Sequence, residues 1–180
     1  MKINPLTYAE LSRPMYVLEE ARLRENLNLI SHVAKEADVE IILAFKAYAL
    51  WRTFPIFREY IKATTASSLF EARLGFEEFG APTHTFSPGY TDYEIDDIAR
   101  CSSHLVFNSL TQYERYHVRA KMENKKLSYG LRVNPEYSEV ETLIYNPCAP
   151  GTRFGISSNK LPKTLPEDID GFHIHCHCES

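Results

Sequence analysis

Short apolar runs alternate with longer amphipathic stretches from about residue 39 onward, and this alternation constrains the fold more than any other feature. The pattern is typical of βα units that build a parallel sheet, and the runs have the length of buried strands. Strands are predicted at Val39 to Phe45, Ala63 to Ala66, Thr83 to Phe86, His104 to Phe107, Leu127 to Val133 and Gly171 to His177. Helices are predicted at Trp51 to Tyr60, Ser68 to Phe79, Asp92 to Ala99 and Ser109 to Met122.

Two segments fall outside this alternation. Met15 to Leu18 predicts a strand and Glu20 to about Lys35 predicts a helix, so residues 1–38 are expected to lead into the repeating part. Asn134 to Leu165 predicts a long loop, and loops of that length are usually functional. Residues 39–180 are expected to form one domain.

Parallel strands joined by helices can close into a barrel or form an open doubly wound sheet. No glycine-rich GxGxxG sequence follows a predicted strand, which disfavours a dinucleotide-binding sheet and favours the barrel. An eight-stranded barrel typically needs ~250 residues, whereas about six strands are predicted within the 180 residues here. The expected fold is therefore α/β, the N-terminal portion of a (β/α)8 barrel truncated after its sixth strand.

The composition excludes several classes of protein. A formal net charge of -4 argues against general nucleic acid binding, which needs clustered Lys and Arg along the phosphate backbone. No apolar stretch approaches the ~20 residues that span a bilayer, and the start lacks the features of a signal peptide. The four cysteines are too scattered for a disulfide scaffold. We therefore expect a cytoplasmic protein with reduced thiols and no membrane segment.

Lys46 directly follows the apolar run Ile41 to Phe45, at the carboxyl end of a predicted strand. In a barrel, that end of the strands carries the active site. A lysine partly desolvated there has its ammonium form disfavoured and can attack a carbonyl cofactor as a free amine. The alternative is a lysine that marks a strand end in solvent, which is a common arrangement.

Three histidines lie on the last predicted strand. Because side chains alternate along a strand, His173, His175 and His177 are expected on one face. They could bind zinc, or one imidazole could stack on an aromatic cofactor. Histidines hydrogen-bonded within a core are the structural alternative. Cys176 and Cys178 are separated by one residue, so they do not match a CxxC site.

Two arginines are candidates for binding an anion. Arg132 lies on a predicted strand, and Arg153 lies in the loop between Gly151 and Gly155. A guanidinium group matches a carboxylate or phosphate with two parallel hydrogen bonds, and the glycines allow close approach of the loop backbone to a ligand. Arginines exposed to solvent are the alternative.

Taken together and in this order, the lysine, arginine and histidine segments resemble the fold-type III pyridoxal-phosphate enzymes. That group includes alanine racemase, ornithine decarboxylase and diaminopimelate decarboxylase. The strings AFKAYALW at residues 44–51, FSPGY at 86–90 and YNPC at 145–148 narrow the resemblance to the carboxynorspermidine/carboxyspermidine decarboxylases. It extends from Pro14 to Ser180.

The resemblance implies roles for individual residues. Lys46 would be the catalytic lysine that binds pyridoxal 5'-phosphate covalently, and His177 would be the histidine stacked on the cofactor ring. Ser180 would lie near the cofactor phosphate, and Arg153 would contact the cofactor phenolate oxygen. Glu179 stands where the wider group usually has glycine, so the backbone there is expected to approach the phosphate differently.

The implied activity is that of a carboxy-lyase that removes the α-carboxylate of carboxynorspermidine or carboxyspermidine in polyamine biosynthesis. The family's C-terminal β-domain and its remaining site residues come later in the sequence, so this chain alone is expected to have little or no turnover. A homodimer is expected of the family. Two alternatives remain: a related decarboxylase of diaminopimelate or ornithine, and a non-catalytic or metal-binding barrel fragment that uses His173, His175 and His177.

Overall fold

The computed structural model describes residues 13–14 and 16–177, and the chain divides into two units, Met1–Val39 and Glu40–Ser180. The first unit contains helix α1 (Glu20–Glu36), which confirms the predicted helix. Of the predicted strand at Met15 to Leu18, Met15 lies outside the described residues, and residues 16–18 form no strand. No described strand pairs with them, and an extended segment without a partner has no ladder hydrogen bonds to hold it.

The second unit contains the alternating elements. Its strands are β1 (Leu43–Ala44), β2 (Thr64–Ala66), β3 (Thr83–Phe86), β4 (Ser102–Phe107), β5 (Ser128–Asn134), β6 (Ile156–Ser157) and β7 (Ile169–Ile174). Its α-helices are α2 (Phe54–Phe57), α3 (Leu69–Leu74), α4 (Ile95–Cys101) and α5 (Leu110–Glu123). Short 3-10 turns occur at Trp51–Thr53 (η2), Leu143–Tyr145 (η4) and Ser158–Lys160 (η5), and a π-helical turn at Gly75–Phe79 (η3).

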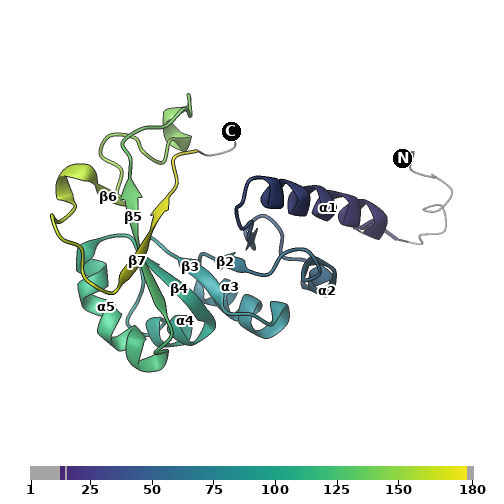
Figure 1. Cartoon of the computed structure of the whole chain (residues 1–180), viewed down its shortest axis with the longest axis horizontal. Coiled ribbons are helices and arrows are strands. Elements are labelled where there is room, and N and C mark those ends of the chain that lie inside the picture. The colour runs from purple at the N-terminus through teal and green to yellow at the C-terminus, as the bar shows by residue number, and fades with distance from the viewer. Residues whose placement is uncertain (1–12, 15, 178–180) are drawn as a thin grey trace. The chain divides into compact units, whose positions relative to one another are not determined.

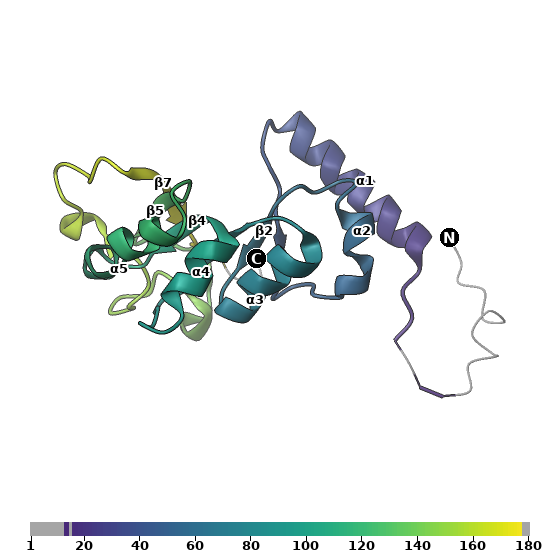
Figure 2. The same cartoon turned by 90° about the horizontal axis from the view of Figure 1, so that it is seen from below.

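All strand pairs in the sheet are parallel, and β1 to β5 lie side by side in chain order. Both β6 and β7 pair with β5. Helices α3, α4 and α5 cover the same face of the sheet (Figures 1 and 2). A doubly wound sheet reverses its strand order and carries helices on both faces, whereas a barrel does neither. The strands are therefore arranged like consecutive strands of a barrel, which agrees with the predicted α/β fold.

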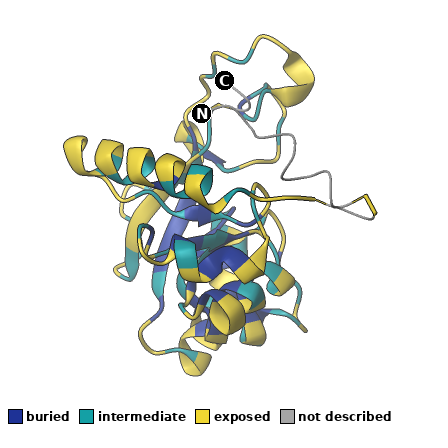
Figure 3. Cartoon of the chain, turned by 90° about the vertical axis from the view of Figure 1, so that its right-hand side faces the viewer, coloured by how far each residue is buried: buried dark blue, intermediate teal, exposed yellow. Residues whose placement is uncertain are grey.

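The main core lies between the strands and this helical layer. Leu105 and Phe107 of β4 and Leu131 of β5 are fully buried, and they pack in one cluster with Ile95 of α4 and Tyr113 of α5. Figure 3 shows the same division, with buried residues concentrated along the strands and exposed residues along the outer sides of the helices. The opposite, inner face of the strands borders the cavities described below.

The structure departs from the predicted elements at several places. The predicted strand Val39 to Phe45 is reduced to the two residues of β1, and β7 ends at Ile174, before the predicted end at His177. Strand β6 lies inside the predicted loop, because a two-residue strand leaves no readable periodicity. Among the described residues, no helix is both long and apolar enough to cross a membrane.

Candidate active site

The carboxyl ends of several strands border a cavity of about 390 Å³. Its lining includes Lys46 after β1, Phe86 at the end of β3, Arg132 on β5, His173 on β7, and His175 just after it. Glu71 of α3 also lines it. The structure thus brings together residues that lie more than a hundred positions apart in the sequence.

Lys46 is placed by a tight turn directly after β1. Ala47 and Tyr48 both donate backbone hydrogen bonds to the carbonyl of Ala44, at 3.0 and 3.1 Å. The preceding Phe45 is buried at 3% exposure and packs against Phe54, with 5.4 Å between ring centroids. The strand end is therefore anchored on one side while the lysine side chain remains exposed at the cavity.

Glu71 was not identified from the sequence, although its spacing carried a usable signal. Ser68 is the N-cap of α3 and accepts a hydrogen bond from the Glu71 backbone amide, at 3.2 Å. The Glu71 carboxylate in turn accepts hydrogen bonds from the backbone amide and the hydroxyl of Ser67, both at 2.7 Å. This serine-to-glutamate spacing is that of a capping box. The helix start therefore fixes a carboxylate in the lining of the cavity.

Arg132 is a buried cation, only 5% exposed. Its guanidinium carbon lies 4.9 Å from the ring centroids of both Phe86 and Phe154. Burial lowers its pKa below the ordinary value for arginine. No hydrogen bond or ion pair joins its side chain to another described residue. Two aromatic faces stabilise the positive charge but neutralise none of it, so this part of the cavity is suited to an anionic group.

His173 pairs with Arg132 across the β5–β7 ladder, and its ring lies edge-on to Phe86 at 4.6 Å. Burial lowers the pKa of His173 to about 4, and the charges of Arg132 and Lys46 act in the same direction. The pKa of His175 is also lowered, by burial first and then by the same two cations. Both imidazoles are therefore neutral near pH 7, where they offer flat, uncharged faces and one acceptor nitrogen each.

Two other predicted site residues, His177 and Arg153, do not line this cavity. His177 is exposed and does not line this cavity, and the strand that would keep it in alternation with His175 ends at Ile174. Arg153 is exposed as well, while its backbone carbonyl is held by Asn108. Ser180 lies outside the described residues. The described residues contain no group of three His, Cys, Asp or Glu side chains placed to hold a metal ion.

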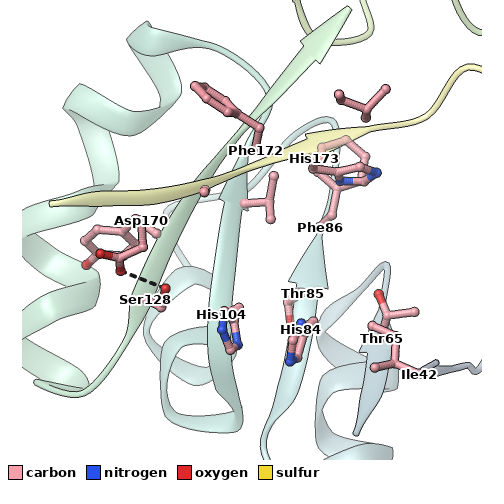
Figure 4. A pocket seen from close by; sticks show the side chains of 15 residues that line it. Ile42, Thr65, His84, Thr85, Phe86, His104, Ser128, Asp170, Phe172 and His173 are labelled. Carbon is pink, nitrogen blue, oxygen red and sulfur yellow. Dashed lines mark hydrogen bonds between the residues drawn. The ribbon is translucent and has the colours of Figure 1, made fainter. Parts of the chain in front are cut away.

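A larger cavity of about 660 Å³ extends along the inner face of the strands (Figure 4). His84 and His104 stack there with ring centroids 3.8 Å apart, and Ser128 donates a hydrogen bond to Asp170 at 2.7 Å. Burial, followed by the charge of His104, lowers the pKa of His84. Lys46 does not line this cavity. The smaller cavity, which combines an amine, a guanidinium and two imidazoles, is the better candidate for chemistry.

No family model matches the chain. It is 42% identical to the carboxyaminopropylagmatine decarboxylase of Synechocystis over 96% of its own length and 44% of that protein. It is 36% identical to the carboxynorspermidine/carboxyspermidine decarboxylase of Campylobacter jejuni, with the same two coverages.

Solved structures share the fold as well. Carboxynorspermidine decarboxylase from Campylobacter jejuni, complexed with norspermidine, matches with a TM-score of 0.79 and 34% identity over 94% of this chain and 42% of that one. Diaminopimelate decarboxylase from Helicobacter pylori, complexed with L-lysine, matches with a TM-score of 0.75. At 13% identity over 95% of this chain and 46% of that one, this second match shows the fold alone.

The chain spans slightly less than half the length of the curated relatives it matches. Within that span, sequence and structure agree on the same group of enzymes, which confirms the resemblance read from the lysine, arginine and histidine segments. The chain is thus a relative of the carboxyaminopropylagmatine and carboxynorspermidine/carboxyspermidine decarboxylases, and it has part of the barrel fold of the fold-type III decarboxylases.

Proposed function

We propose that this chain carries the cofactor-binding lysine of a pyridoxal-phosphate-dependent decarboxylase that acts on carboxylated polyamines. The observation that carries the proposal is the meeting of Lys46, Arg132, His173 and His175 around one cavity at the carboxyl ends of the strands. The relatives support the same chemistry, since their names describe decarboxylases of carboxylated amines.

The residues of the cavity fit pyridoxal 5'-phosphate. The Lys46 amine is suited to the aldehyde of the cofactor, Arg132 to one of its anionic oxygens, and a neutral imidazole to its flat ring. A volume of about 390 Å³ is within the usual range for a small-molecule site. When bound, this cofactor supplies an electron-accepting ring that stabilises the carbanion left after CO₂ departs.

The residues of the chain would then orient the reaction and move its protons. Lys46 would lie beside the reacting carbon, where its ammonium form could donate the proton that replaces the lost carboxylate. Arg132 fixes the position of an anionic oxygen, because its own position is fixed by two rings. His173 and His175 border the site without adding charge, since burial keeps them neutral.

For the histidine that faces the cofactor ring, the sequence motif and the geometry of the cavity suggest different residues. The family motif suggests His177, whereas His175 lines the cavity that contains Lys46. We propose that His175 is a second candidate for this role beside His177. The roles predicted for His177, Ser180 and Arg153 stay predictions, to be examined in a structure that contains the bound cofactor.

The substrate class proposed is a carboxylated polyamine, namely carboxynorspermidine or carboxyspermidine. Carboxyaminopropylagmatine is a second candidate, because the relative with that name is 42% identical to this chain. We further propose that the whole enzyme is a cytoplasmic homodimer, as the family resemblance implies.

Activity on the three carboxylated amines tests the proposal directly. The native-length enzyme is expected to release CO₂ from one of them and to require added pyridoxal phosphate after dialysis. Lys46→Ala is expected to abolish turnover, and the 180-residue chain alone is expected to have little or none. Preference for diaminopimelate or ornithine over all three would contradict the substrate class while leaving the cofactor assignment in place.

A further inference from the structure

Asn108 directly follows β4 and bridges to the loop that precedes β6. Its side chain donates a hydrogen bond to the carbonyl of Arg153 at 2.9 Å and accepts one from the amide of Gly155 at 2.8 Å. Its own backbone amide donates to the side chain of Gln112 in α5, at 2.7 Å. Asn108 is 9% exposed, so one buried residue joins the start of α5 to the loop before β6.

Gly155 brings this loop against the edge of β5. Its φ of +79° is one that residues with side chains rarely adopt. A Cβ at this position would lie 3.0 Å from the amide of Asn134 and 3.1 Å from the carbonyl of Arg132. The loop therefore lies too close to β5 for a side chain at residue 155, and Asn108 holds it there by the Arg153 carbonyl and the Gly155 amide.

The residue between these two contacts is Phe154, whose ring covers the guanidinium of Arg132. Phe86, the other ring in contact with Arg132, belongs to β3 and is held by the sheet. Phe154 has no such support, because its loop has no strand of its own before Ile156. The conformation of the loop, and so the placement of one of the two rings, depends on Asn108.

We propose that Asn108 is a positioning residue: it holds Phe154 over Arg132, so that the buried guanidinium points its free donors into the cavity beside Lys46. This inference rests on the proposed function in one respect only, namely which anion binds to Arg132. The positioning itself is a property of this chain without cofactor.

Chemical modification of Arg132 by phenylglyoxal, followed by peptide mapping, measures this positioning without any activity assay. In Asn108→Ala, the loop loses two hydrogen bonds and opens more often. The modification rate of Arg132 is expected to rise about tenfold relative to exposed Arg52, a factor equivalent to about 1.4 kcal/mol. Hydrogen exchange at the Gly155 amide should accelerate in parallel.

Matched variants separate positioning from a general loss of structure. Asn124→Ala removes hydrogen bonds of similar kind to the carbonyls of Ala99 and Ser102, at the opposite end of β4, and should leave Arg132 unchanged. Phe154→Leu should raise the Arg132 rate, whereas Phe154→Tyr, which keeps the ring, should not.

The proposal is overturned if folded Asn108→Ala leaves both the Arg132 rate and the Gly155 exchange at their original values. Should Asn108→Ala fail to fold, Asn108→Asp retains the acceptor for Gly155, loses the donor to Arg153 and sets a carboxylate oxygen against that carbonyl. A rise in the Arg132 rate then supports the proposal, and no rise rejects it. A failure of pyridoxal phosphate to attach at Lys46 would leave all of these readouts intact, so the two proposals fail separately.

Discussion

Replacement of Tyr90 by phenylalanine removes one hydroxyl from the structure and changes nothing else in shape. That hydroxyl accepts a hydrogen bond from the amide of Ser87 at 3.1 Å and donates to the carbonyl of Val106 at 2.9 Å. Tyr90 is 7% exposed, and burial raises the pKa of its phenol, so the group remains a neutral donor. It ties the chain that leaves β3 to neighbouring β4.

The cost follows from the groups left behind. Without the hydroxyl, the Ser87 amide loses its acceptor and the Val106 carbonyl loses a donor, in a place where water has little access. A buried polar group left unsatisfied costs about 1–3 kcal/mol, so we expect Tyr90→Phe to lower the free energy of unfolding by about 2 kcal/mol. In a protein of this size, that corresponds to a melting temperature about 4–8 °C lower.

Urea unfolding followed by circular dichroism measures the change. With a slope of about 2 kcal/mol per molar, the unfolding midpoint should fall by about 1 M at an unchanged slope. Tyr93, which is 80% exposed, provides the control, and Tyr93→Phe should shift stability by less than about 0.5 kcal/mol. A Tyr90→Phe protein as stable as the control would refute the reasoning about this hydroxyl.

Three further predictions concern other parts of the fold. Gly75→Ala would place a Cβ 2.2 Å from a methyl group of Thr83, and this overpacking should cost about 2 kcal/mol in urea unfolding; full stability would show that the π-helical turn adapts. Since the pKa of His173 is lowered to about 4 from 6.5, the unfolded chain binds the proton more readily, and stability should fall as pH drops through that window. The free energy of unfolding should fall by about 2 kcal/mol after screening by solvent, and by less in His173→Phe. Equal pH profiles for the two proteins would contradict this role of His173. Arg119→Met breaks the exposed pair with Asp96 and should lower the free energy of unfolding only slightly, with no difference left in 1 M salt; a salt-independent loss would indicate lost packing instead.

The pattern of apolar residues along the sequence predicted the positions of most strands of the sheet. Strand β3 has the predicted bounds, Thr83 to Phe86, and α5 matches its prediction to within a residue at each end. These elements bury one clear face, so the sequence carries a strong pattern. The two-residue strands β1 and β6 depend on pairing with neighbours instead, and such pairing leaves no local pattern to read.

The site was readable in part. The position of Lys46 followed from the strand before it, and that of Glu71 could have followed from its spacing after Ser68. The two aromatic contacts of Arg132 could not be predicted, because Phe86 and Phe154 are distant in sequence and meet only through the fold. The three histidines were expected on one face because the predicted strand ran to His177. The pairing of β7 with β5 ends at Val133 and Ile174, so the alternation of side chains does not continue to His177.

The most direct test of the account is covalent labelling of the chain by pyridoxal phosphate. The protein is incubated with the cofactor, reduced with borohydride, and mapped by peptide mass spectrometry. The account predicts that Lys46 carries the label, that Lys46→Arg does not, and that Arg132→Met weakens labelling at low cofactor concentration. A label on another lysine, or labelling spread evenly over the surface lysines, would contradict the assignment of this cavity as the cofactor site.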